Sequence, residues 1–238
     1  MKLGKERNIS ECLLCDSPIS SSLTWRSLFS LAPEQEICSI CSSQFEKIEG
    51  PVCSICGRPQ ESNEKCADCA ARESKTEKRF LLRQNRSVYL YNDAMKDSLA
   101  RFKFRGDAKI IQAFERDFAA GFKAAYPSNT HTLIPIPLSG ERLAERGFNQ
   151  SELLASLLGM PVISPLIRLN NEKQSKKSKT ERLSAEKKFS AAENSAEGMN
   201  VILIDDIYTT GATLHQAAEV LLTAGKASSV SSFTLIRS

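Results

Sequence analysis

The sequence predicts an α/β domain with a mainly parallel sheet flanked by helices, preceded by a separate cysteine-rich module. Two observations carry this prediction. Segments with strand and helix patterns alternate from residue 87 to residue 238, which is typical of a parallel sheet with crossover helices. All eight cysteines lie within the first 69 residues. A charged stretch without clear periodicity lies between them, so we expect a module at 1–72, a connector at 73–86 and the α/β domain at 87–238.

Length, composition and charge are those of an ordinary globular protein. The 238 residues are 41% hydrophobic and 25% charged, which argues against wholesale disorder. The longest aliphatic runs, such as Val201–Ile204, fall far short of the roughly 20 residues of a membrane-spanning helix. The charged first ten residues argue against a secretory signal, so we expect a cytoplasmic protein. A net charge of +4 is compatible with a polyanionic partner but does not require one.

The cysteines form four Cys-x-x-Cys pairs, the spacing of zinc knuckles. Two such pairs complete a tetrahedral site with no open coordination position, so we expect two structural Zn²⁺ ions that supply folding energy. A sequential partition is favoured, while an interleaved arrangement, a single zinc ion or a redox pair are the alternatives. The predicted metal ligands are Cys12, Cys15, Cys38 and Cys41 for one ion and Cys53, Cys56, Cys66 and Cys69 for the other.

The elements of the α/β domain follow from the spacing of apolar residues. Runs of β-branched and aromatic residues bounded by turn formers predict strands, and the continuous aliphatic run at 200–204 is typical of a strand buried on both faces. Apolar residues recurring every three to four positions predict helices. The expected strands are 87–91, 132–136, 161–163, 200–204 and 230–236, and the expected helices are 93–101, 110–122, 150–158 and 213–224. The lysine-rich segment 170–188 lacks an apolar face and is expected to be a mobile loop.

The segment that follows the aliphatic strand indicates a ribose 5-phosphate site. The carboxyl end of such a strand opens on the crevice where α/β sheets bind ligands, and two adjacent carboxylates suit the vicinal hydroxyls of a ribose. The next turn offers backbone amides and hydroxyls at a helix start, where the dipole favours an anion. The predicted ligand-binding residues are Asp205, Asp206, Thr209, Thr210, Gly211, Ala212 and Thr213. The plainer alternative is an acidic turn followed by a threonine helix cap.

Two arginines follow the strand expected at 132–136. Arg142 and Arg146 stand four residues apart, and guanidinium groups are suited to bind phosphate oxygens. The pattern indicates a second anion site beside the first, with a solvated helix face as the alternative.

Taken together, these motifs resemble those of the ComF family, whose members join a cysteine-rich zinc-ribbon module to a type I phosphoribosyltransferase-like domain. The string Val201-Ile-Leu-Ile-Asp-Asp-Ile-Tyr-Thr-Thr-Gly-Ala-Thr213 matches the phosphoribosyl-diphosphate-binding motif of type I phosphoribosyltransferases. The strings Phe102-Lys-Phe-Arg-Gly-Asp107 and Arg146-Gly-Phe-Asn-Gln150 stand in the family's order. The resemblance implies that Arg142 and Arg146 face the diphosphate and that Mg²⁺ accompanies phosphoribosyl diphosphate. Gln174 and Arg182 also fit, whereas Ala185 stands where the family has an asparagine.

The resemblance implies a role in natural competence and transformation, as a DNA-uptake accessory protein that handles single-stranded DNA with a DNA-translocating helicase. Its place would be the cytoplasm or, through partners, the inner face of the membrane. Basic residues next to aromatic ones favour contacts with phosphates and bases, although core packing of Phe102 and Phe104 is the favoured alternative for the aromatic side chains, as solvation is for the lysines. The nucleic-acid candidates are Arg101, Lys103, Arg105, Lys176, Lys177 and Lys179.

The alternative function is an active phosphoribosyltransferase that transfers a phosphoribosyl group from phosphoribosyl diphosphate to an unknown acceptor. That chemistry depends on positioning and Mg²⁺ more than on a dedicated base, so the sequence predicts no catalytic residue and leaves activity open. The two histidines, His131 and His215, are expected in surface or capping roles.

Overall fold

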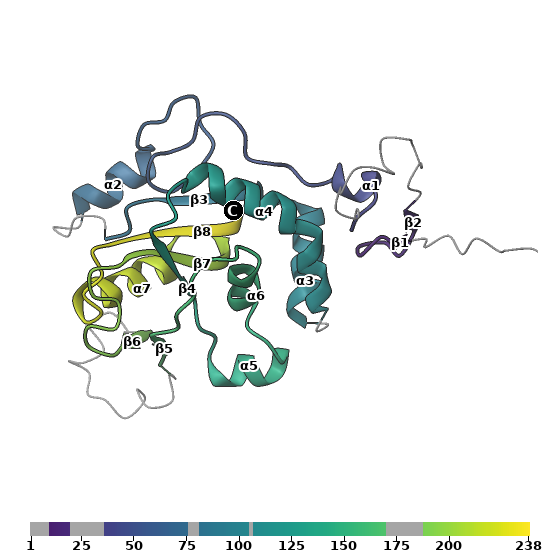
Figure 1. Ribbon diagram of the computed structural model, residues 1–238. Coiled ribbons are helices and arrows are strands. Elements are labelled where there is room, and N and C mark those ends of the chain that lie inside the picture. Colours follow the sequence, from purple (N-terminus) through teal and green to yellow (C-terminus); the bar gives the residue numbers. More distant parts are fainter. Residues whose placement is uncertain (1–9, 20–35, 76–80, 105–106, 170–187) are drawn as a thin grey trace, which may run out of the picture.

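The computed structural model describes residues 10–19, 36–75, 81–104, 107–169 and 188–238 (Figure 1). Within these ranges the largest sheet has four strands in the order β3-β8-β7-β4, and every neighbouring pair is parallel. Its strands are β3 (Asn85–Leu90), β4 (His131–Pro135), β7 (Asn200–Tyr208) and β8 (Ser229–Arg237). The predicted mainly parallel sheet is confirmed.

Helices cover both faces of this sheet because alternate side chains of β7 are buried on opposite sides. Val201 and Leu203 belong to the apolar cluster that contains α7 (Ala212–Thr223). Ile202 and Ile204 belong to a second cluster, which contains four helical segments on the other face of the sheet. These helices are α3 (Asp93–Phe104), the 3₁₀ turn η1 (Ala108–Ile111), α4 (Gln112–Ala125) and α6 (Gln150–Ser156). Burial on both faces is what the continuous aliphatic run predicts.

The phenylalanines of α4 fix this helix on the sheet. Phe114, Phe118 and Phe122 recur every four residues and are all buried. Phe118 and Phe122 pack on Phe233 of β8 with ring centroids 4.8 and 5.4 Å apart. Each aromatic pair of this kind contributes about 0.5–1.5 kcal/mol beyond the buried area. The predicted amphipathic helix is therefore confirmed.

The cysteine-rich segment forms two small units that lie at different ends of the sheet (Figure 1). The first ribbon, described at 10–19 and 36–43, contains β1 (Ser10–Glu11), β2 (Pro18–Ile19) and α1 (Ser39–Ser42). The second ribbon, residues 51–75, ends in α2 (Ala67–Lys75). Arg101 of α3 holds the first ribbon by donating hydrogen bonds to the carbonyl oxygens of Leu14 and Leu13, at 2.5 and 3.2 Å.

Several element boundaries differ from those the sequence predicts. Helix α3 continues to Phe104 instead of ending near residue 101, because buried Phe102 extends the apolar face of Met95 and Leu99. Helix α2 and strand β3 both reach into the range expected as a connector. Residues 161–163 form a single bridge, Leu133 to Val162, in place of the predicted strand.

Three further short elements frame one edge of the sheet. They are α5 (Gly140–Arg146) and an antiparallel pair made of β5 (Leu166–Arg168) and β6 (Phe189–Ala191). The helices in the described ranges are all too short or too polar to cross a membrane.

Candidate functional site

The eight cysteines form two groups of four, divided sequentially along the chain. The sulfur atoms of each group lie within 4.8 Å of one another. The Cys15 and Cys38 sulfurs are 3.7 Å apart, and the Cys56 and Cys66 sulfurs are 3.8 Å apart. Tetrahedral zinc with Zn–S bonds of about 2.3 Å separates its sulfur ligands by about 3.8 Å. Both groups therefore fit a structural Zn²⁺ ion, and the interleaved arrangement is wrong.

The two metal sites differ in burial and in what supports them. In the first ribbon the Cys15 side chain is exposed and Cys38 is half-buried, whereas the second ribbon buries all four cysteines. The amide of Cys66 donates to the Cys53 sulfur at 3.3 Å, a bond that favours the thiolate. Gly57, with φ of +70°, would place a Cβ 2.7 Å from the carbonyl oxygen of Asn85. The second ribbon therefore presses directly on β3.

A cavity of about 220 Å³ lies at the carboxyl edge of the sheet, where β7 leads into α7 and β4 leads toward α5. Its lining includes the predicted residues of both anion sites, namely Asp205, Asp206, Thr209, Thr210, Gly211, Ala212, Thr213, Arg142 and Arg146. The structure thus brings together segments more than fifty residues apart in the sequence. Their ligand-binding role stays a prediction.

The turn at 209–213, which we call the phosphate loop, depends on a glycine. Gly211 has φ of +76°, and a Cβ there would lie 2.3 Å from the Tyr208 hydroxyl oxygen. Gly211 is also the N-cap residue of α7 and has no side chain with which to cap the helix. The first-turn amides of α7 lack partners within the helix. The Ala212 amide donates a long hydrogen bond of 3.4 Å to the Thr210 hydroxyl, a contact that an anion could replace.

The two carboxylates at the end of β7 have different surroundings. Asp205 Oδ1 accepts hydrogen bonds from the Ser151 hydroxyl and the Asp206 amide, each at 3.0 Å. Burial, followed by the charge of Asp206, raises the pKa of Asp205 to about 7. Asp206 forms an ion pair with Lys103 of α3. A bound cation would lower the pKa of Asp205, because a nearby positive charge stabilises the carboxylate.

Four basic side chains line the cavity from three elements, namely Lys103 of α3, Arg142 and Arg146 of α5, and Arg168 of β5. Arg168 was not predicted from the sequence. Its guanidinium lies over the ring of Phe189, 5.6 Å from the centroid, and burial, followed by the charge of Arg142, lowers its pKa. Arg146 donates a 2.8 Å hydrogen bond to Gln150. This cluster beside the phosphate loop favours a ligand with more than one anionic group.

The structure separates the residues predicted to contact nucleic acid. Lys103 faces the cavity and pairs with Asp206, while Arg101 is held by the first ribbon and by Asp107 at 3.2 Å. Phe102 is buried in the core, which confirms core packing for that residue and excludes base stacking in this conformation. The other basic candidates, Arg105, Lys176, Lys177 and Lys179, lie outside the described residues.

Neither histidine is among the residues that line the cavity at the end of β7. His131 Nδ1 lies 2.9 Å from the carbonyl oxygen of Ser128. His215 of α7 is half-buried instead of lying on the open surface. Burial, followed by the charge of Arg72, lowers its pKa to about 4, so His215 is neutral at pH 7.

Comparisons with known proteins agree with this architecture. A family model described as a phosphoribosyl transferase domain matches residues 117–238, and one described as a double zinc ribbon domain matches residues 10–70. An adenine phosphoribosyltransferase from Leishmania tarentolae aligns with 64% of this chain and 78% of its own at 14% identity, with a TM-score of 0.32. A structural similarity this low carries no argument about the fold or the function of this chain.

Curated relatives span nearly the whole chain. Competence protein ComFC of Bacillus subtilis is 60% identical over 95% of both chains. Competence protein ComFC of Streptococcus pneumoniae is 35% identical over 95% of this chain and 100% of its own. The DNA utilization protein YhgH of Escherichia coli is 25% identical over 80% of this chain and 86% of its own.

Proposed function

The chain belongs to the family of ComFC competence proteins, and we propose that it is an accessory protein of DNA uptake that binds phosphoribosyl diphosphate, or a related ribose 5-phosphate ligand, in the cavity at the end of β7. It would also bind single-stranded DNA and work with a DNA-translocating helicase. Its place would be the cytoplasm and, through these partners, the inner face of the membrane.

One observation carries the ligand assignment, namely that the phosphate loop and the basic cluster line the same cavity. Asp205 and Asp206 provide acceptors for the two ribose hydroxyls, and the first turn of α7 provides donors for the 5-phosphate. Arg142 and Arg146 line the same cavity and provide charge for a diphosphate. A ribose that carries phosphate at both ends uses all three features.

Mg²⁺ fits the same arrangement as a companion of the ligand. Carboxylate and phosphate oxygens are the ligands this hard cation prefers, and it is usually held by one or two carboxylates together with substrate phosphates. When bound, the ion would neutralise part of the diphosphate charge. Asp205, whose pKa burial raises to about 7, would lose its proton more readily beside the Mg²⁺ ion, because a nearby positive charge favours the carboxylate.

The double variant Asp205→Asn, Asp206→Asn tests the assignment by calorimetry with Mg²⁺ and phosphoribosyl diphosphate. Because asparagine keeps the shape of each side chain and removes both charges, we expect binding to weaken at least tenfold. If the carboxylates did not contact the ligand, removing two negative charges would instead strengthen the binding of a polyanion. A matched control is Glu193→Gln, Glu197→Gln, which removes two exposed carboxylates elsewhere. Unchanged or tighter binding by the folded aspartate variant would reject the pocket.

An active phosphoribosyltransferase is the second candidate, and the basic cluster favours it. Arg142, Arg146 and Arg168 would stabilise the negative charge of a departing diphosphate. Both candidates need the same cavity and differ in whether bound phosphoribosyl diphosphate is consumed. Diphosphate release, measured with and without single-stranded DNA and with candidate acceptors, separates them. Release that depends on a small acceptor would favour the enzyme, and intact ligand would favour the accessory protein.

The proposal on DNA rests on the relatives and on charge. The names of the relatives refer to competence and DNA utilization, and this chain carries an excess of basic residues. Since Lys103 and Arg101 are engaged within the protein, the remaining candidates for contacts with DNA phosphates are Arg105, Lys176, Lys177 and Lys179.

A further inference from the structure

We propose that the second zinc ribbon positions the phosphate loop through Arg72 and Arg237, so that zinc in this ribbon and ligand in the cavity stabilise each other. The inference rests on the proposed ligand of the cavity. It assigns a functional role to a metal site that lies outside that cavity.

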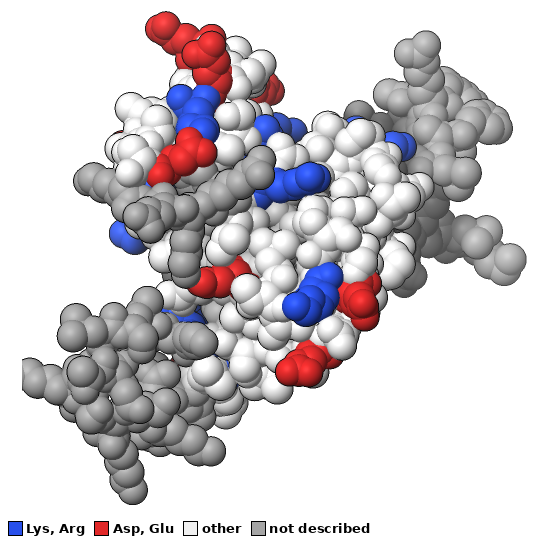
Figure 2. Space-filling view, turned by 90° about the vertical axis from the view of Figure 1, so that its left-hand side faces the viewer, with Lys and Arg blue, Asp and Glu red and all other residues white. Residues whose placement is uncertain are grey.

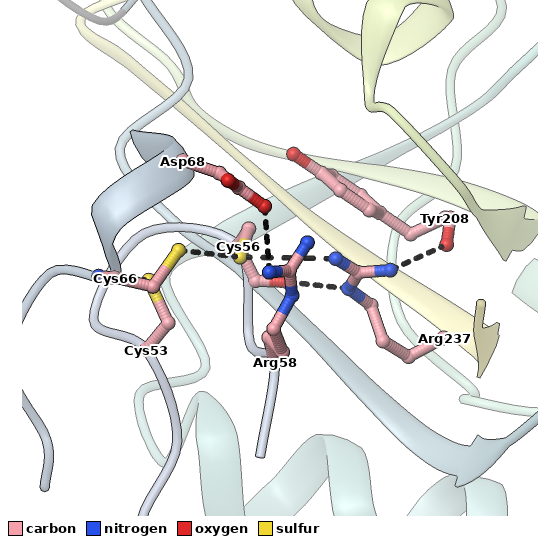
Figure 3. A network of polar contacts seen from close by, with 7 residues as sticks. All are labelled: Cys53, Cys56, Arg58, Cys66, Asp68, Tyr208 and Arg237. Atoms are coloured by element: carbon pink, nitrogen blue, oxygen red, sulfur yellow. Dashed lines mark hydrogen bonds and ion pairs between the residues drawn. The ribbon is translucent and has the colours of Figure 1, made fainter. Parts of the chain in front are cut away.

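The first connection runs through Arg237, the penultimate residue, which is only 5% exposed (Figure 3). Its Nε donates to the Cys56 carbonyl oxygen at 3.3 Å, and its Nη2 lies 3.9 Å from the Cys56 sulfur. Its Nη1 donates to the Tyr208 carbonyl oxygen at 3.4 Å, and the guanidinium lies over the Tyr208 ring, 5.0 Å from the centroid. One buried side chain therefore joins a zinc ligand to the last residue of β7.

The ring of Tyr208 also contacts the backbone of the phosphate loop. A Cβ at Gly211 would lie 2.3 Å from the Tyr208 hydroxyl oxygen and 2.5 Å from the Cζ atom of its ring, so the ring and the loop backbone touch. The position of the ring thus limits where the loop can lie. Arg237 packs on the same ring. A displacement of Cys56 would therefore move Arg237 and the Tyr208 ring, and with them the backbone at Gly211.

The second connection runs directly from α2 to the loop. Arg72 Nη1 donates a 2.9 Å hydrogen bond to the Thr210 carbonyl oxygen. Arg72 follows the zinc ligand Cys69 by three residues on the same helix, so both side chains lie on one side of α2. Coordination of Cys69 consequently fixes the direction from which Arg72 approaches the loop.

Packing distinguishes the second ribbon from the first in this respect. All four cysteines of the second ribbon share an apolar cluster with Tyr208 and with Leu214 of α7. The first ribbon buries Cys12 and Cys41 with Ile19 in a small cluster, which Leu14 joins to the helices on the opposite face of the sheet. Among the described residues, only the second metal site therefore shares a cluster with both Tyr208 and α7, which flank the phosphate loop.

Coupling of this kind acts in both directions. If zinc in the second ribbon favours the binding conformation of the loop, then ligand in the cavity must favour retention of that zinc by the same factor. Ligand affinity and zinc retention are thus two readouts of one interaction.

The experiment compares Arg72→Ala with Arg58→Ala in the full zinc-loaded chain. Both remove one arginine from the second ribbon, but Arg58 forms its ion pair within the ribbon, 2.6 Å from Asp68. We measure affinity for Mg²⁺-phosphoribosyl diphosphate and the rate of zinc release to a chelator, with and without saturating ligand. The Arg72→Ala variant should bind the ligand three- to tenfold more weakly. Saturating ligand should also no longer slow the release of zinc from the second ribbon in this variant. Arg58→Ala should keep the wild-type affinity and the protection of zinc by ligand, whatever its basal rate of zinc release, because the Arg58 charge acts on Cys66 and Cys56 and not on the loop. Arg72→Lys, which keeps a donor, should recover most of both effects.

The outcomes separate the coupling from the proposed function. A merely electrostatic effect of Arg72 would lower affinity but leave the protection of zinc at saturating ligand unchanged, and that result would overturn the coupling. The coupling would also be overturned if ligand did not slow zinc release in the wild type. It would be overturned as well if the Arg72→Ala and Arg58→Ala variants had the same ligand affinity and the same protection of zinc. A wild type that binds no phosphoribosyl diphosphate would overturn the proposed ligand, and the coupling with it.

Discussion

Gly211 is a residue at which two independent constraints favour glycine. Its φ of +76° lies in the left-handed region, and a Cβ would collide with the Tyr208 hydroxyl. The first constraint alone costs about 1–2 kcal/mol for a residue with a Cβ. The second requires the ring of Tyr208 to move, and that ring is held by Arg237.

Gly211→Ala should therefore destabilise the protein by more than about 2 kcal/mol and also weaken binding of phosphoribosyl diphosphate. The control is Gly198→Ala, because Gly198 has a similar φ of +71° but no atom within 4 Å of an added Cβ. The control should show only the conformational cost and should bind ligand normally. Urea unfolding and calorimetry measure the two quantities, and equal effects of the two substitutions would count against the close contact.

At the same scale, the sequence predicts those site residues that belong to a local motif and misses those that packing brings in. Asp205 and Asp206 directly follow the aliphatic run 200–204 and lie in the carboxyl-terminal half of β7, so their place near that edge of the sheet can be foreseen. Arg168 reaches the cavity through pairing of β5 with β6, about twenty residues further along the chain. Arg72 and Arg237 depend on how the second ribbon packs on the sheet, and no spacing in the sequence encodes that contact.

At the scale of elements, long periodic segments are predicted well because their burial is decided by their own pattern. The aliphatic strand and the phenylalanine-rich helix are examples. Short elements such as α5 and β5 have too few residues for a period to be visible. Both ribbons are built from Cys-x-x-Cys pairs, yet they differ in burial because only the second shares an apolar cluster with α7.

This difference predicts two rates of zinc loss. A chelator should remove the zinc of the first ribbon faster, since Cys15 is exposed and Cys38 half-buried, whereas the second site must open before its ligands are reached. Elemental analysis should find two zinc ions per chain before treatment. The Cys15→Ser variant should lose the fast phase and keep the slow one. A single phase that releases both ions would contradict the assignment.

At the scale of the whole molecule, the net charge is only +4. Figure 2 shows the face that carries α2 and α7, where Lys and Arg are interspersed with Asp and Glu and the described residues form no continuous basic area. Mixed charges of this kind offer a DNA strand little net attraction. The lysines at 176, 177 and 179 follow one another closely in the sequence and would supply a local electrostatic contact with DNA phosphates.

Replacing Lys176, Lys177 and Lys179 by glutamine should weaken binding of a single-stranded oligonucleotide and reduce its dependence on salt. Each phosphate contact contributes about 0.7 to the slope of log K against log salt for single strands. Losing three contacts should therefore flatten the slope by about 2. The control replaces Lys96 of α3, Lys109 of η1 and Lys123 of α4, three exposed lysines, and changes the net charge equally. Fluorescence anisotropy over a salt series gives both slopes. A general effect of net charge would reduce the slopes of both variants alike. A local contact would flatten only the slope of the variant at 176, 177 and 179, because screening leaves little interaction between exposed charges beyond about 10 Å at moderate salt.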